Sequence, residues 1–356
     1  MSGQRQSAGQ VLLSVCIPTY NFGEFIGQTL ETILPQVGDG VEVLILDGGS
    51  TDDTPAVIDA LRERFPGLRY ERRQERGGID RDIALMVSMA RGEYCWLFCS
   101  DDLMRADAVE RVLARIVTGL DVYLCGFTLC ALDMRPVVEH PILNVPHDAE
   151  YDLNDRRQRQ NYFEHAQTTE AFFSFAGSVI VKRARWNAYE LDERFVGSCW
   201  AHVARIFAMM GDGLQVGYLS GSYLDKRSGN DSFLDRGIVR RYALAIDGYH
   251  HLASTFFGEM SMETHHIHRV VANEFPLWVM LHAKAETRRS RPQDLPLLNR
   301  LAATAWAGTG LANRIKHGVF RLTPSRAYEW ALACYRPLRA GAGLMRRSAA
   351  PQATAR

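Results

Sequence analysis

Short apolar runs alternate with segments of helical periodicity between residues 12 and 125. Such alternation is typical of a sheet assembled from βα units, in which helices connect strands and cover the sheet. We expect strands at 12–17, 41–46, 68–71, 94–98 and 121–124, separated by helices at 24–34, 53–65, 80–90 and 106–117. The pattern therefore predicts an α/β fold with a mixed, mainly parallel sheet flanked by helices.

The alternation fades beyond residue 125. The polar stretch 141–167 predicts a long surface loop, because it is rich in Asp, Arg, Gln and Asn. We expect strands at 178–182 and 214–219, a helix at 201–210, a loop at 226–235 and then a mainly helical tail. These changes divide the chain into segments 1–125, 126–235 and 236–356.

Composition excludes several classes of protein. Lys plus Arg and Asp plus Glu both number 41, so no global charge favours a nucleic-acid partner. The seven cysteines show no CxxC pair and are expected to be buried, reduced thiols. The first apolar run, 11–17, is too short for a signal peptide, and no window reaches the roughly 18 apolar residues of a membrane span. Cytoplasmic localisation is the resulting expectation.

The last forty or so residues are basic and interleaved with aromatic side chains. The basic residues include Arg314, Lys316, Arg321, Arg326, Arg336, Arg339, Arg346 and Arg347, and the acidic residue among them is Glu329. Such a helical segment can make a peripheral contact with an anionic membrane surface. A solvated helix face with a frayed terminus fits the pattern equally well.

Unusual residues follow three of the expected strands: Pro-Thr-Tyr-Asn at 18–21, Asp-Gly-Gly-Ser-Thr-Asp-Asp at 47–53 and Ser-Asp-Asp at 100–102. In an open α/β sheet such loops gather at the carboxyl edge, where ligands bind. No GxGxxG follows the first strand, which argues against a dinucleotide site and hydride transfer. Ser50 and Asp53 are expected to form a capping box at the start of the second helix.

The motifs IPTYN, DGGSTDDT and GEYCWLF-x-SDD together resemble the family 2 glycosyltransferases of the GT-A fold over residues 11–118. GGIDRDIA and KRSGND look similar to abequosyltransferase-like enzymes of surface-polysaccharide (O-antigen) synthesis. The resemblance implies a Rossmann-like GT-A domain with its donor-binding half at 1–125 and its acceptor-binding half at 126–235, followed by a helical extension. It also implies a nucleoside-diphosphate sugar donor and a lipid-linked or growing glycan acceptor at the inner face of the plasma membrane.

The resemblance places the nucleotide at the first two loops. Asp47 would read the base, because a carboxylate can accept hydrogen bonds from a nucleobase; a helix-entry acid is the alternative. Thr19 and Asn21 would line the same pocket, with Pro18 setting the turn. Gly49, next to Gly48, allows the backbone to approach a ligand closely.

Asp101 and Asp102 offer two hard oxygen ligands after the fourth strand, and these suit Mg²⁺ or Mn²⁺ beside a diphosphate. Ser100 would join them in the donor site. Relatives commonly have an acid two positions before the metal-binding Asp, where this chain has Cys99. A capping role for the acids is the alternative. Asp80 and Arg81 would add donor contacts, although Asp80 could equally cap a helix.

Inverting transfer needs a base for the acceptor hydroxyl, and the Glu-Asp pair of most relatives is replaced here by residues 197–202. His202 is the substitute we infer, since its unperturbed pKa near 6.5 suits a general base; a histidine packed between helices is the alternative. Asp192 and Glu193 are the next candidates. Arg227 and Asn230, in a polar loop that also holds Lys226 and Asp231, would fold over the diphosphate or simply be solvated.

Two other functions stay open. The missing Glu-Asp pair and Cys99 would suit a catalytically degenerate GT-A domain that binds nucleotide or organises an assembly complex. A nucleotidyltransferase ranks lowest, since no glycine-rich, basic triphosphate loop lies near the N-terminus.

Overall fold

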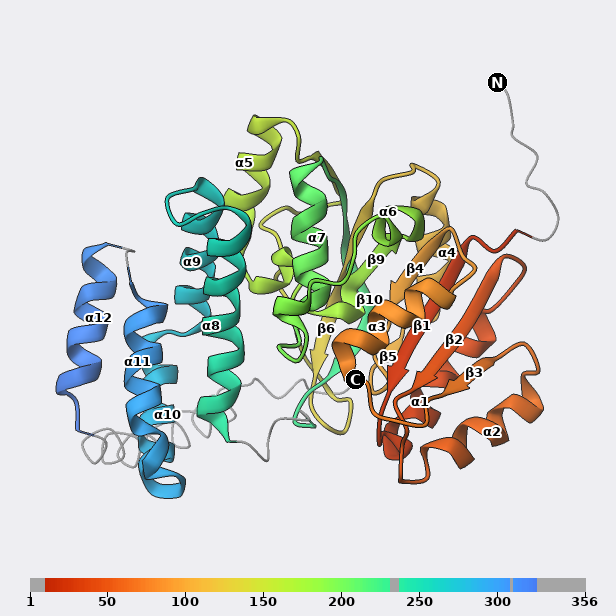
Figure 1. The fold of residues 1–356 in the computed structure, drawn as a ribbon, viewed down its shortest axis with the longest axis horizontal. Helices are drawn as coiled ribbons and strands as arrows, with labels where there is room; N and C mark the ends of the chain where they lie inside the picture. Colours follow the sequence, from red (N-terminus) through yellow and green to blue (C-terminus); the bar gives the residue numbers. More distant parts are fainter. Residues whose placement is uncertain (1–9, 231–236, 308–309, 325–356) are drawn as a thin grey trace, which may run out of the picture. The chain divides into compact units, whose positions relative to one another are not determined.

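The computed structural model describes residues 10–230, 237–307 and 310–324 (Figure 1). The strands are β1 (Leu13–Thr19), β2 (Val41–Asp47), β3 (Arg69–Arg72), β4 (Tyr94–Leu97), β5 (Leu103–Met104), β6 (Val122–Cys130), β7 (Pro136–Glu139), β8 (Ala149–Asp152), β9 (Val179–Lys182) and β10 (Gln215–Arg227). The helices are α1 (Gly23–Ile33), α2 (Thr54–Arg64), α3 (Ile79–Met89), α4 (Ala108–Ile116), α5 (Arg156–His165), α6 (Arg183–Asn187), α7 (Ala201–Gly211), α8 (Ile238–Phe256), α9 (Met262–Glu274), α10 (Leu277–Ser290), α11 (Leu295–Ala305) and α12 (Leu311–Leu322).

The described strands form one mixed sheet in the order β3-β2-β1-β4-β9-β6-β10-β5, with β7 on β6 and β8 on β10. The first half is parallel: β1 lies between β2 and β4, and β2 pairs with β3. β9 is antiparallel to both β4 and β6, and it joins this half to the parallel pair β6 and β10. The predicted α/β class with a mixed, mainly parallel sheet is confirmed.

The helices lie on the two faces that right-handed crossovers require. The chain steps across the sheet from β1 to β2 to β3 and then returns to β4 on the far side of β1. Right-handed connections therefore put α1 and α2 on one face and α3 on the other. α1 packs on α2, and α3 packs with α6 and α7 (Figure 1). The carboxyl ends of β1, β2 and β4 meet at one edge, where Thr19 stands opposite Asp47.

The polar stretch 141–167 is more ordered than its composition suggested. It contains β8 and α5, so a long loop was the wrong prediction for this stretch. α5 buries Tyr162 and Phe163 from among ten residues, which leaves almost no apolar period to detect. The Asp155 side chain caps α5 by accepting from the N–H groups of Arg157 and Gln158.

Three further expectations need correction or comment. The predicted capping box fails, because Asp53 makes no capping hydrogen bond and Asp52 instead accepts from the Thr54 N–H at 3.0 Å. The strand expected at 214–219 extends to Arg227, so Lys226 and Arg227 belong to β10 rather than to a loop. Asp231 lies outside the described residues.

The chain divides into two compact units. The described residues up to 230, with Gly248–Val270, form the first unit, which holds the sheet. Residues 237–247 and the described residues from 271 onward form the second, which contains α10, α11 and α12. The mainly helical C-terminal region is as predicted. Among described residues no helix is long and apolar enough to cross a membrane, and the six described cysteines are free thiols.

Candidate functional site

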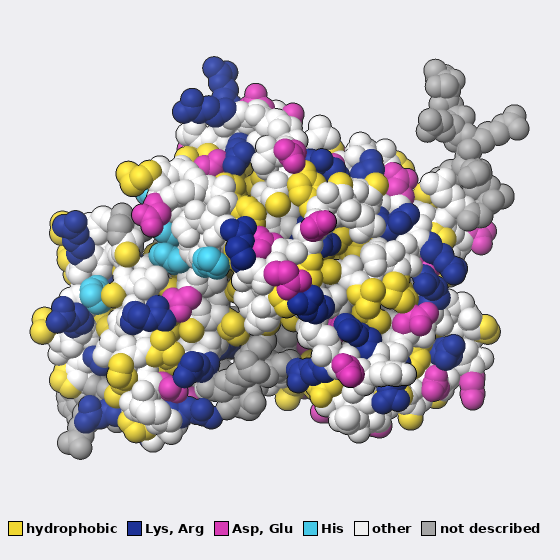
Figure 2. All heavy atoms as spheres, viewed as in Figure 1, with side chains coloured by type: hydrophobic (Ala, Val, Ile, Leu, Met, Phe, Trp, Pro, Cys, Tyr) yellow, Lys and Arg dark blue, Asp and Glu magenta, His cyan; other side chains and the backbone are white. Residues whose placement is uncertain are grey.

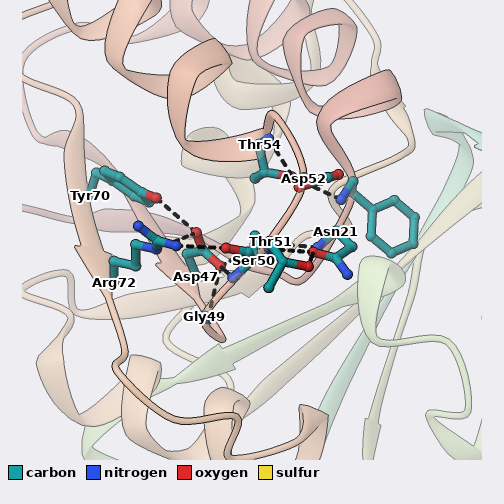
Figure 3. A network of polar contacts seen from close by, with 10 residues as sticks. Asn21, Asp47, Gly49, Ser50, Thr51, Asp52, Thr54, Tyr70 and Arg72 are labelled. Carbon is teal, nitrogen blue, oxygen red and sulfur yellow. Dashed lines mark hydrogen bonds and ion pairs between the residues drawn. The ribbon is translucent and has the colours of Figure 1, made fainter.

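Asp47 is fully buried at the end of β2 and organises the loop that follows it. Its Oδ1 accepts from the Gly49 N–H at 3.0 Å and from the N–H and hydroxyl of Ser50, both at 2.7 Å. Its Oδ2 accepts from the Tyr70 phenol at 2.8 Å and lies 3.7 Å from Arg72 Nε (Figure 3). Burial and the bond to Asp47 raise the pKa of Tyr70, so the phenol stays a donor. The contact of Asp47 with a nucleobase stays a prediction.

The same network ties the loop after β1 to the loop after β2 (Figure 3). Asn21 has a left-handed backbone with φ of 57°, and its N–H donates to Ser50 Oγ at 2.9 Å. Its side-chain Oδ1 accepts from the Thr51 N–H at 2.8 Å. Asp52 accepts from the Gly23 N–H at 3.0 Å. The structure therefore brings the predicted residues Asn21, Asp47 and Gly49 into one rigid arrangement.

Thr19 offers a polar atom that lacks a partner. The residue is 4% exposed at the end of β1, and its hydroxyl has no hydrogen-bond partner among the described residues. A buried hydroxyl without a partner is unfavourable by about 1–3 kcal/mol, so a polar group of a ligand would be stabilised there. Pro18 precedes it within β1, opposite Leu46 of β2.

Asp82 on α3 is a buried acid that sequence reasoning missed. It is 5% exposed, and its Oδ1 accepts from Arg73 Nη1 at 2.7 Å. Burial raises the pKa of Asp82 although Arg73 opposes the rise. A Cβ on Gly48 would lie 3.1 Å from Asp82 Oδ2, so glycine at 48 gives this carboxylate its place beside the β2 loop. Asp82 lies in the first turn of α3, where acidic residues are common, so its position in the sequence gives no specific sign of a site.

Asp101 and Asp102 form an acid pair after β4, in which Asp101 is partly buried and Asp102 is buried. Asp102 is 2% exposed, and its Oδ1 accepts from the Arg227 backbone N–H at 2.8 Å. Asp101 Oδ2 accepts from the Asn230 side-chain amide at 2.6 Å. Burial raises the pKa of both carboxyls, and Asp101 raises that of Asp102 further. The predicted Ser100 is buried just before the pair. Two confined carboxylates of like charge favour a cation between them.

The ligand atoms of Cys99, Asp101 and Asp102 all lie within 4.8 Å of one another. Burial and the neighbouring acids raise the pKa of the Cys99 thiol well above its ordinary value. A soft sulfur donor also suits Mg²⁺ and Mn²⁺ less well than a carboxylate oxygen does. The two carboxylates are the hard oxygen donors that Mg²⁺ and Mn²⁺ prefer. The acid pair therefore fits the expected divalent metal, with coordination from Asp101 and Asp102 rather than from Cys99.

Arg227 holds the acid pair in place. Its guanidinium donates to the Asp101 carbonyl at 2.9 Å, to the Leu132 carbonyl at 2.6 Å and to Gln28 Oε1 at 2.8 Å. The Arg227 guanidinium carbon lies 4.8 Å from the centre of the Phe25 ring, and the residue is 6% exposed. These contacts occupy the guanidinium within the protein. Direct binding of a diphosphate by Arg227 stays a prediction.

Lys226, named above as part of the polar loop, belongs to a second polar group whose other members, His140 and Glu170, were not expected from the sequence. Its ammonium lies 4.0 Å from the centre of the Phe175 ring. Nearby, His140 Nε2 and Glu170 Oε2 are 3.0 Å apart. Burial opposes ionisation of Glu170, but His140 and Lys226 lower its pKa to about 2. The positive charge of Lys226 also opposes the burial-driven rise in the pKa of Asp101. Nothing in the local sequence links residues so far apart.

Asp80 caps a helix, but not its own. Its Oδ2 accepts from the N–H groups of Gly197 at 2.8 Å and Cys199 at 3.1 Å, and its Oδ1 accepts from the Ala201 N–H at 3.1 Å. Gly197 and Cys199 both have positive φ, 85° and 69°, which curls the loop around the carboxylate. Trp200, the N-cap residue of α7, makes no side-chain cap. Asp80 thus fixes the start of α7, and its contact with a donor stays a prediction.

Arg81 makes a two-pronged ion pair with Glu193, with N to O distances of 3.0 and 2.7 Å. Both side chains are largely exposed. Asp192 accepts from the Arg194 N–H at 3.0 Å. The structure therefore joins the predicted Arg81 and Glu193, and it gives Asp192 a local capping contact. Catalytic roles for Asp192 and Glu193, and donor binding by Arg81, stay predictions.

His202 lies in the first turn of α7 and is 6% exposed. Its Nε2 is 3.0 Å from the Phe173 carbonyl, so this nitrogen carries the hydrogen and donates. Burial lowers the pKa of His202, which keeps the ring neutral. Its Nδ1 then holds a free lone pair, and it has no hydrogen-bond partner among residues that the structure describes. That is the protonation state that a general base requires.

Known proteins are similar to this chain in sequence and in fold. The family described as "Glycosyl transferase family 2" matches residues 14–178. Abequosyltransferase RfbV of Salmonella typhimurium is 31% identical over 255 residues, which are 70% of this chain and 76% of that protein. S. aureus TarS 1-349 in complex with UDP-GlcNAc has a TM-score of 0.59 at 15% identity, over 92% of each chain.

A second solved structure, the mannosyltransferase PcManGT from Pyrobaculum calidifontis in complex with GDP-Man and Mn²⁺, has a TM-score of 0.51 at 18% identity. The likeness covers 93% of this chain and 83% of that one. Both solved structures support the GT-A arrangement expected from the motifs. With its three loop motifs at one sheet edge and its extended match to RfbV, the chain belongs to glycosyl transferase family 2.

Proposed function

We propose that this protein transfers a hexosyl or deoxyhexosyl group from a nucleoside-diphosphate sugar to a lipid-linked or growing glycan, with inversion and with a divalent metal. The observation that carries the proposal is the acid pair of Asp101, partly buried, and Asp102, buried, which Asn230 and Arg227 hold. A bound Mg²⁺ or Mn²⁺ would neutralise charge on the departing diphosphate. The similarity to RfbV supports a role in bacterial surface-polysaccharide synthesis.

The donor nucleotide would lie at the edge formed by β1 and β2. The Thr19 hydroxyl lacks a partner there among the described residues. Gly49 has a positive φ of 89°, which lets the loop turn sharply after β2. Asp47 would hold the loop after β2 in position beside the nucleotide, and it would also contact the base. Lys226 would add positive charge beside the acid pair, where negative charge develops on the leaving group.

His202 would act as the base. The acceptor hydroxyl attacks the anomeric carbon, a new C–O bond forms, and the bond to the diphosphate breaks with its electron pair leaving on oxygen. The hydroxyl proton passes to His202 Nδ1, the nitrogen that the bond from Nε2 to Phe173 leaves unprotonated. Asp80 would position the ring by fixing the start of α7.

The test is donor turnover by Asp101→Asn, with Asp59→Asn as the control at an exposed acid on α2. Turnover of nucleotide sugar is measured with and without Mn²⁺, and Mn²⁺ binding is measured separately by electron paramagnetic resonance. We expect Asp101→Asn to lose both binding and turnover, while the control resembles the wild type.

Full turnover by Asp101→Asn would overturn the metal assignment. Wild-type protein that binds nucleotide sugars without ever turning them over would favour the catalytically degenerate scaffold instead. The acceptor is tested by supplying lipid-linked and water-soluble glycans in parallel, at the same donor concentration.

A further inference from the structure

Helix α12, in the second unit, presents an apolar stripe to solvent. Leu311, Ile315 and Leu322 are 74%, 57% and 84% exposed, and Val319 is 40% exposed. At about 100° per residue these four side chains fall within an arc of roughly 80°. Phe320, which is fully buried, lies on the opposite side of the helix. The stripe is therefore one continuous face rather than scattered surface residues.

The packing of the second unit does not use this stripe. Phe320 contacts Trp306 with ring centres 5.8 Å apart, and Lys284 of α10 donates to the Phe320 carbonyl at 2.7 Å. These contacts engage the buried side of α12. Leu311 and Leu322, the most exposed members of the stripe, take little part in this packing, so the unit's own stability does not explain them.

Basic residues accompany the stripe. Arg314 and Arg321 are exposed and lie along one flank of it, and α12 contains no acidic residue. The whole chain has equal numbers of basic and acidic residues, so this is a local concentration of positive charge. Figure 2 shows hydrophobic and basic side chains next to one another at the left edge, where α12 lies in Figure 1.

We propose that the exposed face of α12 docks on an anionic membrane surface. The stripe would enter the boundary between headgroups and acyl chains, while the arginines on its flank bind lipid phosphates. A helix that pairs an apolar face with a row of cations matches both layers of such a surface. A purely apolar partner would leave Arg314 and Arg321 without counter-charges, and that favours the lipid surface over a second copy of this chain.

This inference deepens the proposed function, since docking would bring the enzyme to a lipid-linked acceptor. The test needs neither donor nor acceptor, so the membrane proposal and the proposed transferase function can fail separately. Full-length protein is sedimented with vesicles of phosphatidylcholine alone and with vesicles that also contain phosphatidylglycerol. The variants are Ile315→Glu with Leu322→Glu, and Arg314→Ala with Arg321→Ala. Val117→Glu is the matched control, because Val117 is 73% exposed in the first unit.

We expect wild type and the Val117 variant to bind the phosphatidylglycerol vesicles and not the neutral ones. Loss of two arginines should weaken binding roughly 30-fold, at about 1 kcal/mol each, and the two glutamates should weaken it at least about ten-fold. Light scattering checks the oligomeric state of every protein. No binding by wild type would overturn the proposal, as would glutamate variants that separate a dimer but bind vesicles normally.

Discussion

Replacing Asp80 should loosen the loop at residues 197–201 and the start of α7. The Asp80 carboxylate is 5% exposed and accepts from three backbone N–H groups that lie more than a hundred residues away in sequence. Hydrogen bonds to a charged group contribute about 1.5–3 kcal/mol each, and part is regained when water reaches the freed loop. We therefore expect Asp80→Ala to lower the free energy of unfolding by about 3–5 kcal/mol.

Asp80→Asn is the sharper test, because it keeps the shape of the side chain. Its amide oxygen can still accept from Gly197 and Cys199, but its NH₂ group then meets the Ala201 N–H, donor against donor. The expected loss is about 2 kcal/mol, against at most about 0.5 kcal/mol for Asp59→Asn at an exposed site. Urea unfolding measures these losses, and hydrogen exchange by mass spectrometry should show faster exchange at 197–201.

Unchanged exchange at 197–201 in Asp80→Asn would refute the capping interpretation. A further result separates the two roles considered for Asp80. If the affinity for nucleotide sugar falls more than about ten-fold while exchange and stability stay as in the wild type, Asp80 contacts the donor directly.

Two other changes test the site. Arg227→Lys removes the planar fork that reaches Asp101, Leu132 and Gln28, so the free energy of unfolding should fall by about 2 kcal/mol or more; an unchanged urea midpoint would contradict this clamp. Burial lowers the pKa of His202 in the folded protein, so as the pH falls below about 6.5 the imidazole takes up a proton in the unfolded chain but not in the folded one. The free energy of unfolding therefore decreases with falling pH until the pH reaches the pKa of His202 in the folded protein. His202→Gln should flatten this part of the stability–pH curve relative to wild type, and an identical slope would contradict burial of a neutral imidazole.

Periodic segments were predictable from the sequence alone. The strands β1, β2 and β4 begin and end within one or two residues of expectation, because each is an apolar run whose side chains are buried in the sheet. α5 was missed since only Tyr162 and Phe163 of its ten residues are buried. Its helix is fixed by the Asp155 cap and by tertiary packing, and neither produces an apolar period.

The loop motifs carry structural information as well as chemistry. The side chains of Asp47, Ser50 and Asp52 form hydrogen bonds within their own loop and with the residues that follow β1. A motif of this kind identifies the fold reliably, because most of its residues hold the two loops in position. For the same reason, the motif alone suggests more ligand-contacting residues than these hydrogen bonds leave free. The Thr19 hydroxyl has no partner among the described residues, and it is the more specific sign of a binding site.

The start of α7 and the surroundings of Lys226 depend on contacts that no local pattern encodes. Asp80 reaches α7 from α3, Glu170 meets His140, and the Lys226 ammonium acts on both Glu170 and Asp101. Each partner is an ordinary polar residue in its own segment, and only the folded sheet brings them together. The Glu-Asp pair that the family resemblance led us to expect at the start of α7 is not found at residues 197–202. Asp80 instead brings a carboxylate to this helix start from α3, and His202 Nδ1 lies at the same end of α7 without a hydrogen-bond partner among the described residues.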